Sequence, residues 1–216
     1  MREALALYGR VLVETEVTSG PLDPLVRFED GTSLPFPVTR YLAPADRLDQ
    51  LLLDEIAGPV LDVGCGPGRH LQALSARGVY ALGVDLSEVA VKLARGGGAR
   101  AIVADIFDEL PLVGRWRTAL LLDGNIGIGG DPVRLLSRVR SLLRHDGVAL
   151  VELGSPGSAN QTARARLELA GESSDWFPWA SLAADEVAGV ACEAGMSLEQ
   201  RWSCAGRWFA WLQPTG

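Results

Sequence analysis

The stretch VLDVGCGPG, residues 60–68, decides the fold of this chain. Its first four residues are mostly apolar and partly β-branched, so we expect a buried strand that ends at Val63. Gly64, Gly66 and Gly68 then allow unusual φ angles and let the backbone approach a ligand closely. Apolar residues recur at helical spacing from residue 69 onward. The stretch therefore predicts a strand, a ligand-binding turn and a helix in succession.

Short apolar runs alternate with amphipathic stretches after this turn. We expect helices over residues 69–77, 87–95 and from 132 onward, and strands over residues 79–85, 100–105, 118–123 and 148–153. Ser87 and Asp131 suit N-cap positions, and Pro132 suits the first helical position. Residues 145–147 are expected to end the last of these helices. The alternation predicts an α/β fold with a parallel sheet, right-handed crossovers and helices on both faces.

The segments on either side of this region do not show the same alternation of strand-like and helix-like stretches. Before it we expect a strand over residues 11–17, a proline-rich loop at 34–37 and a helix over 46–56. After it we expect a small-residue loop at 154–161, an aromatic cluster at 175–179 and a helix over 184–194. The last two segments, 197–203 and 207–213, can pair as a hairpin across Ala205 and Gly206.

Composition and charge narrow the classes of function. The chain has 216 residues and a formal net charge of −7, which suits one domain and disfavours a nucleic-acid partner. Three cysteines without a CxxC pair and only two histidines predict neither a metal site nor a disulfide framework. The apolar runs are too short to cross a bilayer, and the first residues do not resemble a signal peptide. We therefore expect a cytoplasmic protein.

The glycine turn departs from the pattern of nicotinamide dinucleotide folds. That pattern is G-x-G-x-x-G, and its third glycine would fall at Arg69. A pyrophosphate also disfavours a nearby carboxylate, whereas Asp62 precedes the first glycine by two positions. S-adenosylmethionine (SAM) has no phosphate and carries two cationic groups, an α-amino group and a sulfonium. An acidic residue beside the loop suits SAM better than NAD.

Residues 60–68 resemble motif I of the class I SAM-dependent methyltransferases, and the downstream segments match that family as well. Residues 83–87 resemble its second motif, residues 104–107 the segment after its third strand, residues 121–127 its fourth-strand position, and residues 143–147 its turn before strand five. The resemblance covers residues 58–153 and extends to the C-terminal hairpin. The overall pattern is also similar to a group of actinobacterial methyltransferase-domain proteins.

This resemblance implies a fold, a domain plan and a set of cofactor-binding residues. The implied fold is a single Rossmann-like, doubly wound, mostly parallel seven-stranded sheet with an antiparallel C-terminal strand. Residues 1–57 would form an N-terminal cap that covers the substrate, and residues 58–216 the SAM-binding methyltransferase domain. Asp85 would hold the ribose hydroxyls and Asp105 the adenine amino group. The full implied set is Asp62, Gly64, Cys65, Gly66, Pro67, Gly68, Asp85, Leu86, Asp105, Ile106 and Asp123.

Three residues are candidates for a catalytic role. His70 lies in the first turn of the helix that opens at the SAM loop, although a packing or hydrogen-bonding role is the alternative. His145 precedes strand five and so lies at the wrong end of the sheet, where a helix C-terminus would favour it. Asp123 and Asn125 follow strand four, beside the expected methyl donor. No proline pair or aromatic residue follows Asn125, which weakens a reading as a DNA base methylase.

Several other residues have two open interpretations. Arg69 is either a contact to the SAM carboxylate or an exposed helix arginine. Trp176, Phe177 and Trp179 are either a lid over an apolar substrate or part of the core. Cys65 is expected to be a small loop filler rather than a nucleophile. Tyr8, Arg40 and Tyr41 lie in the predicted cap, where this family commonly closes over SAM.

The sequence favours a SAM-dependent methyltransferase acting on an O, N or C nucleophile of a small molecule. The acidic net charge and the absence of a nucleic-acid-binding appendage support a small acceptor. The alternative is a SAM-binding protein that does not methylate, namely a cyclase, a decarboxylase or a SAM-sensing subunit. The motifs are common to all of these, so they do not separate them.

Overall fold

A computed structural model of the chain describes residues 1–17, 22, 24–158 and 161–215. Its main element is a seven-stranded sheet in the order β11-β12-β7-β6-β3-β4-β5. The strands are β3 (Val60–Val63), β4 (Ala81–Asp85), β5 (Ala101–Val103), β6 (Trp116–Leu121), β7 (Leu143–Leu153), β11 (Met196–Cys204) and β12 (Arg207–Pro214). Strands β3 to β7 pair in parallel, whereas β12 runs antiparallel to both β7 and β11. The predicted fold class is confirmed, including the antiparallel C-terminal hairpin.

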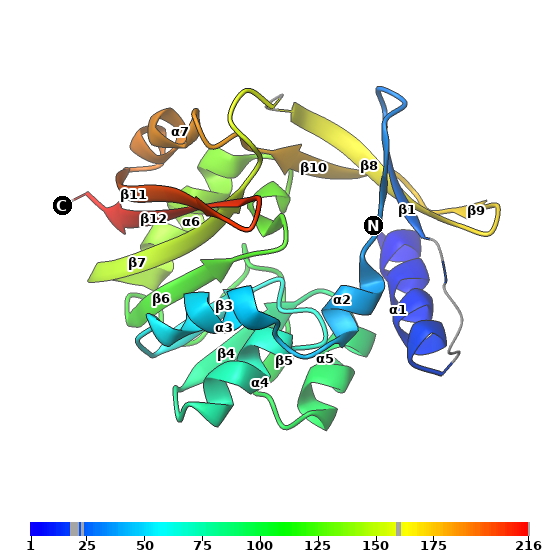
Figure 1. Ribbon diagram of the computed structural model, residues 1–216, viewed down its shortest axis with the longest axis horizontal. Coiled ribbons are helices and arrows are strands. Elements are labelled where there is room, and N and C mark those ends of the chain that lie inside the picture. The colour runs from blue at the N-terminus through cyan, green and yellow to red at the C-terminus, as the bar shows by residue number, and fades with distance from the viewer. Residues whose placement is uncertain (18–21, 23, 159–160, 216) are drawn as a thin grey trace.

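Helices cover both faces of this sheet (Figure 1). Helices α3 (Arg47–Asp54), α4 (Arg69–Ala76) and α5 (Glu88–Gly96) cover one face, and α6 (Pro132–Leu142) and α7 (Val187–Glu193) cover the other. The side chain of Ser87 accepts a hydrogen bond from the Ala90 N–H at 3.2 Å, and that of Asp131 accepts one from the Arg134 N–H at 3.0 Å. Both predicted N-caps are therefore present, and each satisfies a free helical N–H group.

A second, antiparallel sheet combines segments from two distant parts of the chain. Its strands are β1 (Leu25–Phe28), β2 (Ser33–Pro35), β8 (Gln161–Leu169), β9 (Glu172–Ser173) and β10 (Phe177–Ser181). They follow the order β10-β8-β1-β2, and β9 pairs with β8. Helix α1 (Arg2–Val17) packs beside β8, and the short helix α2 (Val38–Leu42) follows β2. Figure 1 shows this assembly, called the cap sheet below, beside the carboxyl ends of the parallel strands.

The strand expected over residues 11–17 is wrong, because this segment belongs to helix α1. Ala4, Leu7 and Val11 are buried at helical spacing, and Leu12 extends this stripe against the cap sheet. The alternation of β-branched residues from Val11 onward is local, whereas the helical pattern begins earlier. A window starting at residue 4 would have shown the longer period.

Other boundaries differ from those expected. Strand β7 begins at Leu143, directly after α6, so residues 145–147 belong to the strand. The His145 side chain is 96% exposed there and does not lie at a helix C-terminus. Strand β8 was not predicted, although its alternating residues have the period of two that strands show. The loop expected at 154–161 includes residues 159 and 160, which lie outside the described residues. No helix within the described residues is long and apolar enough to cross a membrane.

Candidate active site

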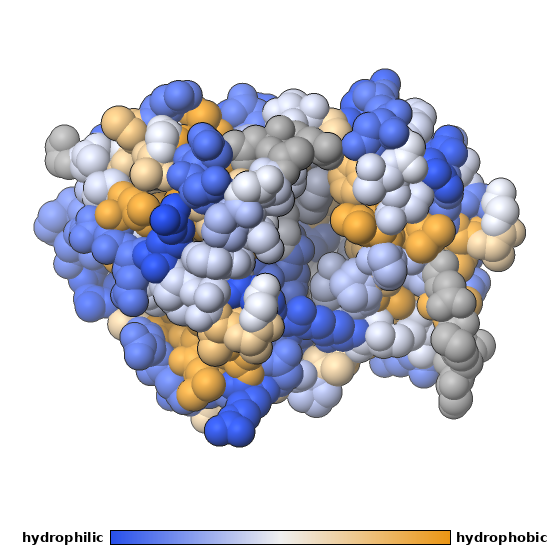
Figure 2. Space-filling view, turned by 45° about the horizontal axis from the view of Figure 1, so that its top comes forward, coloured by the Kyte–Doolittle hydropathy of each residue, from blue (hydrophilic) through white to orange (hydrophobic). Residues whose placement is uncertain are grey.

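A cavity of about 570 Å³ lies at the carboxyl ends of the parallel strands, between the seven-stranded sheet and the cap sheet. Figure 2 shows the molecular surface hollowed between these two parts. Ligands of open α/β sheets bind at this end of the strands. Most of the predicted site residues line the cavity: Gly64, Cys65, Gly66, Pro67, His70, Asp85, Leu86, Asp105, Ile106, Asp123 and Asn125. Asp62 and Gly68 are not among the residues that line it.

The glycine loop has the backbone geometry that its sequence predicts. Gly64, Gly66 and Gly68 have φ angles of 70°, 53° and 89°, in the left-handed region that favours glycine. The Asn125 side chain holds this loop, because its Nδ2 donates hydrogen bonds to the carbonyl oxygens of Val63 at 2.7 Å and Gly64 at 3.0 Å. A Cβ at Gly64 would lie 2.7 Å from that nitrogen. Asn125 therefore fixes the start of the glycine loop through its side-chain amide.

Asp85 ends β4 at the edge of the cavity. Its Oδ2 accepts a hydrogen bond from the Gly66 N–H at 2.9 Å, and its Oδ1 accepts one from the Ser87 N–H at 2.8 Å. Burial raises the pKa of this carboxyl group, and the two N–H donors oppose that rise. An ionised carboxylate has about four acceptor positions, so each oxygen can accept a further hydrogen bond from a ligand.

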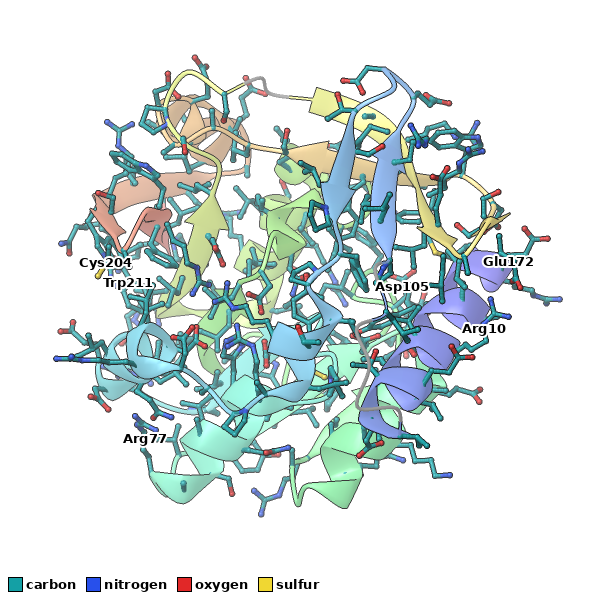
Figure 3. The ribbon with its side chains drawn as sticks, turned by 45° about the vertical axis from the view of Figure 1, so that its right-hand side comes forward. Arg10, Arg77, Asp105, Glu172, Cys204 and Trp211 are labelled. Atoms are coloured by element: carbon teal, nitrogen blue, oxygen red, sulfur yellow. The ribbon has the colours of Figure 1, made fainter. Side chains whose placement is uncertain are left out.

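Asp105 and Phe107 form the next part of the cavity wall. Oδ1 of Asp105 accepts a hydrogen bond from the Phe107 N–H at 3.0 Å, which fixes the turn after β5. The Arg134 guanidinium lies over the Phe107 ring at 3.9 Å from its centroid. In Figure 3, Asp105 lies inside the molecule, whereas Arg10 and Glu172 lie at its periphery. This wall therefore offers a ligand one carboxylate edge and an apolar surface.

Asp62 is a buried acid directly before the glycine loop. The residue is 1% exposed, and its Oδ2 has no hydrogen-bond partner among the described residues. Burial raises the pKa of Asp62 to about 6, while the nearby His70 opposes this shift. A buried carboxylate oxygen without a donor is a costly feature in a folded protein. Such an oxygen favours a cationic group near the loop.

Arg69 crosses the floor of the cavity and binds two acids. Its Nη2 donates to both carboxylate oxygens of Asp123, at 2.9 and 2.8 Å, and its Nη1 donates to Asp49. The Arg69 side chain is 4% exposed, so its interpretation as an exposed helix arginine is wrong. Asp123 has a φ of 56°, which is strained for a residue other than glycine. The ion pair with Arg69 holds Asp123 in this conformation.

Two further residues complete what we call the buried charge cluster, which consists of Asp49, Arg69, Asp123, Glu152 and Arg207. Arg207 donates from Nε and Nη2 to Glu152, at 2.7 and 2.6 Å, and from Nη1 to Asp49 at 3.1 Å. Oε2 of Glu152 accepts a hydrogen bond from the Asp123 N–H at 2.7 Å. The cluster thereby joins α3, α4, β7 and β12 to the loop after β6.

His70 lies against this cluster. Its Nε2 is 3.7 Å from Oδ1 of Asp49, too far for a hydrogen bond, and it has no hydrogen-bond partner among the described residues. Burial alone would raise the pKa of Asp49, but His70 and Arg69 outweigh burial and hold that pKa well below its ordinary value. His70 therefore combines an electrostatic contact to Asp49 with a position on the cavity wall.

Aromatic residues close the cavity on the side of the cap sheet. Tyr8 and Tyr41 both contact Phe36 edge to face, with ring centroids 5.7 and 5.4 Å apart. Burial raises the pKa of both tyrosines, so their hydroxyl groups stay protonated at neutral pH. Phe177 and Trp179 also line the cavity, as the lid interpretation expects. The residues that line the cavity do not include Trp176, whose ring faces the Arg166 guanidinium at 4.8 Å.

Cys65 is packed rather than reactive. Burial raises the pKa of its thiol, and the carboxylates of Asp62 and Asp85 raise it further. A thiol with a raised pKa has little of the nucleophilic thiolate form at neutral pH. Its buried side chain packs with α4 and α5, as expected of a loop filler.

Comparisons with known proteins agree with this geometry. Residues 60–147 match the family model described as "Methyltransferase domain". A comparison with curated proteins gave no match. The structure is similar to a SAM-dependent methyltransferase from Bacteroides fragilis in complex with S-adenosyl-L-homocysteine (SAH), at 20% identity and a TM-score of 0.81. That match covers 97% of this chain and 94% of the other, so it includes the cap sheet and α1.

Two further solved structures share the fold over most of the chain. One is 1,6-didemethyltoxoflavin-N1-methyltransferase from Burkholderia thailandensis, with 19% identity, a TM-score of 0.57 and coverage of 79% of this chain and 78% of the other. The other is the sugar N-methyltransferase KedS8 from a Streptoalloteichus species, with 20% identity, a TM-score of 0.60 and coverage of 81% and 88%. Residues 60–147, which include the glycine loop, thus match a methyltransferase domain, and the chain as a whole has the fold of solved SAM-dependent methyltransferases.

Proposed function

We propose that this enzyme transfers the methyl group of SAM to an O, N or C nucleophile of a small molecule. The observation that carries the proposal is that one cavity is lined both by the SAM-loop residues and by side chains of the cap sheet. A methyl acceptor must reach the donor within a few ångströms, and a shared cavity allows this contact. We propose that residues 1–57, with β8 to β10, form the cover over the acceptor.

The cavity offers SAM polar and apolar side chains that suit its parts. We propose that Asp85 accepts hydrogen bonds from the ribose hydroxyls and that Asp105, Ile106 and Leu86 enclose the adenine. The glycine loop would lie against the methionine part, with the unpaired oxygen of Asp62 favouring its α-amino group. Gly68 would act indirectly, since a Cβ there would lie 2.8 Å from the Ala94 side chain. When bound, SAM supplies a methyl group already activated by the sulfonium.

The protein's contribution to the transfer is then mainly position and orientation. Asp123 is ion-paired with Arg69, and Asn125 is hydrogen-bonded to the glycine loop, so we propose that both orient the reactants rather than exchange protons. Tyr8 and Tyr41 line the cavity, and their protonated hydroxyl groups can donate hydrogen bonds to a reactant. His70 also lines the cavity, and we propose it as the proton acceptor where the acceptor must lose a proton.

A small acceptor agrees with the charge and with the shape of the site. The chain carries a formal net charge of −7, which disfavours a nucleic-acid substrate. The cap sheet lies over the strand ends and restricts access by a macromolecule. Two structurally similar enzymes are described as acting on 1,6-didemethyltoxoflavin and on a sugar, which are both small molecules.

Calorimetric titration of the purified protein with SAM, SAH and NAD tests the cofactor assignment. We expect micromolar dissociation constants for SAM and SAH and no binding of NAD. A screen of small phenols, amines and sugars for SAH formation then tests methyl transfer. Binding of SAM without SAH formation on any acceptor, together with release of methylthioadenosine or carbon dioxide, would instead favour a protein that uses SAM without methylating.

A further inference from the structure

The wall that the cap sheet and helix α1 contribute to the cavity differs in chemistry from the opposite wall. The charged side chains that line the cavity all come from the seven-stranded sheet and the helices and loops around it: Arg69, Asp85, Asp105, Asp123 and Arg134. Among the described residues of the cap sheet, α1, α2 and the residues adjoining them, those that line the cavity have uncharged side chains: Met1, Ala4, Leu5, Tyr8, Val26, Phe28, Leu34, Pro35, Phe36, Pro37, Tyr41, Leu167, Phe177, Pro178 and Trp179. The cavity therefore has one polar wall and one apolar wall.

The apolar wall arises from the alternation of side chains in the cap sheet. Val26 and Phe28 of β1 face the cavity, whereas Arg27 between them pairs with Glu168 on the other face at 2.9 Å. Glu168 also pairs with Arg166 at 2.6 Å. One face of the sheet is thus charged and the other apolar, as in sheets that bury one face.

Part of this apolar face is not covered by protein. Leu34 of β2 lines the cavity and is 52% exposed, and Val26 and Phe28 are only half-buried. Exposed apolar side chains that gather in a concave site mark a surface for a ligand. The glycine loop lines the same cavity, so a ligand on this apolar face would lie beside the proposed methyl donor.

The apolar wall is rich in aromatic rings that meet at right angles. Phe36 contacts Tyr8 and Tyr41 at interplanar angles of 82° and 77°, and Phe177 contacts Trp179 at 87°. Rings in such positions offer both faces and edges to a flat guest, which favours stacked and edge-to-face contacts. A sugar, by contrast, presents hydroxyl groups that would lose their hydrogen bonds to water against this wall.

We propose that the methyl acceptor is an uncharged molecule with an aromatic ring, which packs on the apolar face formed by Val26, Phe28, Leu34, Phe36 and Phe177. This inference rests on the proposed function and narrows its substrate class. The ring lies against the cap sheet, and only its nucleophilic oxygen or nitrogen faces the methyl donor near Asp123. Ring contacts supply the affinity, and the polar wall orients the reacting atom.

The chemistry of transfer is consistent with such an acceptor. A lone pair of the acceptor forms the new bond to the methyl carbon, and the carbon–sulfur bond breaks with its electron pair left on sulfur, which gives neutral SAH. An aromatic amine becomes a methylammonium and then loses a proton to water. A phenol gives up its proton before or during attack, and aromatic hydroxyl groups ionise more readily than those of sugars.

Binding of 2-naphthol and of methyl α-D-glucopyranoside to the SAH-saturated enzyme tests the proposal. We expect calorimetry to detect saturable binding of 2-naphthol and none of the glucoside. Leu34→Ser should weaken 2-naphthol binding about tenfold, because it removes an apolar contact from the wall. The same variant should leave SAH affinity unchanged.

Leu25→Ser is the matched control, since Leu25 is a half-buried leucine of the same sheet that does not line the cavity. It should leave both affinities unchanged. Binding of the glucoside instead of 2-naphthol, or 2-naphthol binding that is insensitive to Leu34→Ser or equally sensitive to both variants, would overturn the aromatic assignment. Failure of SAH itself to bind would contradict the proposed function, so the two failures are distinguishable.

Discussion

The two sheets of this molecule face one cavity with opposite chemistry. The seven-stranded sheet brings acids and arginines to the cavity from its strand ends and from the turns that follow. The cap sheet brings apolar and aromatic side chains and keeps its charges on the outer face. A methyltransferase must bind one ligand that is the same in all family members and one that differs. The difference between the sheets agrees with the proposal that SAM lies against one wall and the acceptor against the other.

The two sheets also differ in how they are stabilised. The strand ends of the seven-stranded sheet are joined by the buried charge cluster, in which Asp49 and Arg69 are almost inaccessible to water. The charged pairs of the cap sheet are more accessible to solvent: the side chains of Arg27 and Glu168 are 36% and 19% exposed. Buried ion pairs are costly to break, because the remaining partner stays desolvated, whereas surface pairs contribute little. Substitutions should therefore have unequal effects in the two sheets.

The largest expected effect is that of Arg69→Met. This change leaves Asp49 and Asp123 buried beside the cavity without their main partner, and should lower the free energy of unfolding by about 3–5 kcal/mol. Denaturation by urea, followed by circular dichroism, measures it. Arg27→Met is the matched control in the cap sheet and should change the midpoint of urea denaturation very little. Similar losses for both variants would contradict the contrast between the sheets.

Asp85→Ala tests the part of the polar wall that we propose binds the ribose. Loss of the carboxylate releases the Gly66 N–H and would remove the proposed charge-assisted hydrogen bonds to the ribose, so SAH affinity should fall by about 2–4 kcal/mol. Calorimetric titration with SAH gives this value. Leu34→Ser should leave SAH affinity unchanged and weaken only the binding of 2-naphthol. Near-normal SAH affinity in Asp85→Ala would show that the ribose does not lie at this residue.

The pH dependence of stability should reveal Asp62, the buried acid of the seven-stranded sheet. Burial raises its pKa from 3.8 to about 6 in the folded protein. The folded state then binds more protons than the unfolded state between these values, so stability falls as pH rises from about 4 to 6. Asp62→Asn removes this contribution. The free energy of unfolding of the variant, relative to that of the wild type, should therefore rise by up to about 3 kcal/mol between pH 4 and pH 6.

Urea denaturation of both proteins at pH 4, 5, 6 and 7 measures this difference. Asp49, whose pKa is shifted downward, is present in both proteins, so its contribution cancels in the comparison. A constant difference between wild type and Asp62→Asn across these pH values would mean that Asp62 titrates at its ordinary pKa in the folded protein.

The seven-stranded sheet was predictable because its determinants are local in the sequence. The glycine loop, the N-caps Ser87 and Asp131 and the acid that ends β4 each depend on a few adjacent residues. Hydrogen bonds within a turn or a cap follow from residue type and spacing. The sequence therefore sufficed to predict the order of strands and helices from β3 to α6 and the glycine loop between β3 and α4.

The cap sheet was not predictable, because it depends on pairing between distant segments. Strand β1 pairs with β8, so that Phe28 lies opposite Ala165, and no local signal marks this partnership. The buried charge cluster has the same character: Arg207 binds Asp49 across 158 positions of sequence. Sequence reasoning missed Asp49, Glu152 and Arg207, since an acid or arginine within a helix or strand normally reads as a solvated residue.

The smallest expected effect concerns two glycines with the same backbone angle. Gly64 and Gly78 both have a φ of 70°, so alanine at either position should cost about 1 kcal/mol of folding free energy through backbone strain. A Cβ at Gly78 meets nothing within 4 Å, whereas one at Gly64 lies 2.7 Å from Asn125 Nδ2. Gly64→Ala should therefore cost about 1–2 kcal/mol more than Gly78→Ala.

Thermal unfolding of both variants gives the comparison, and SAH titration adds a second readout. Gly78→Ala should bind SAH normally, because it lies at the far end of α4, whereas Gly64→Ala should bind it more weakly through displacement of Asn125 and the loop. If the two variants unfold at the same temperature and bind SAH equally, the Asn125 amide moves aside at little cost. Asn125 would then be free to orient the acceptor instead of holding the loop.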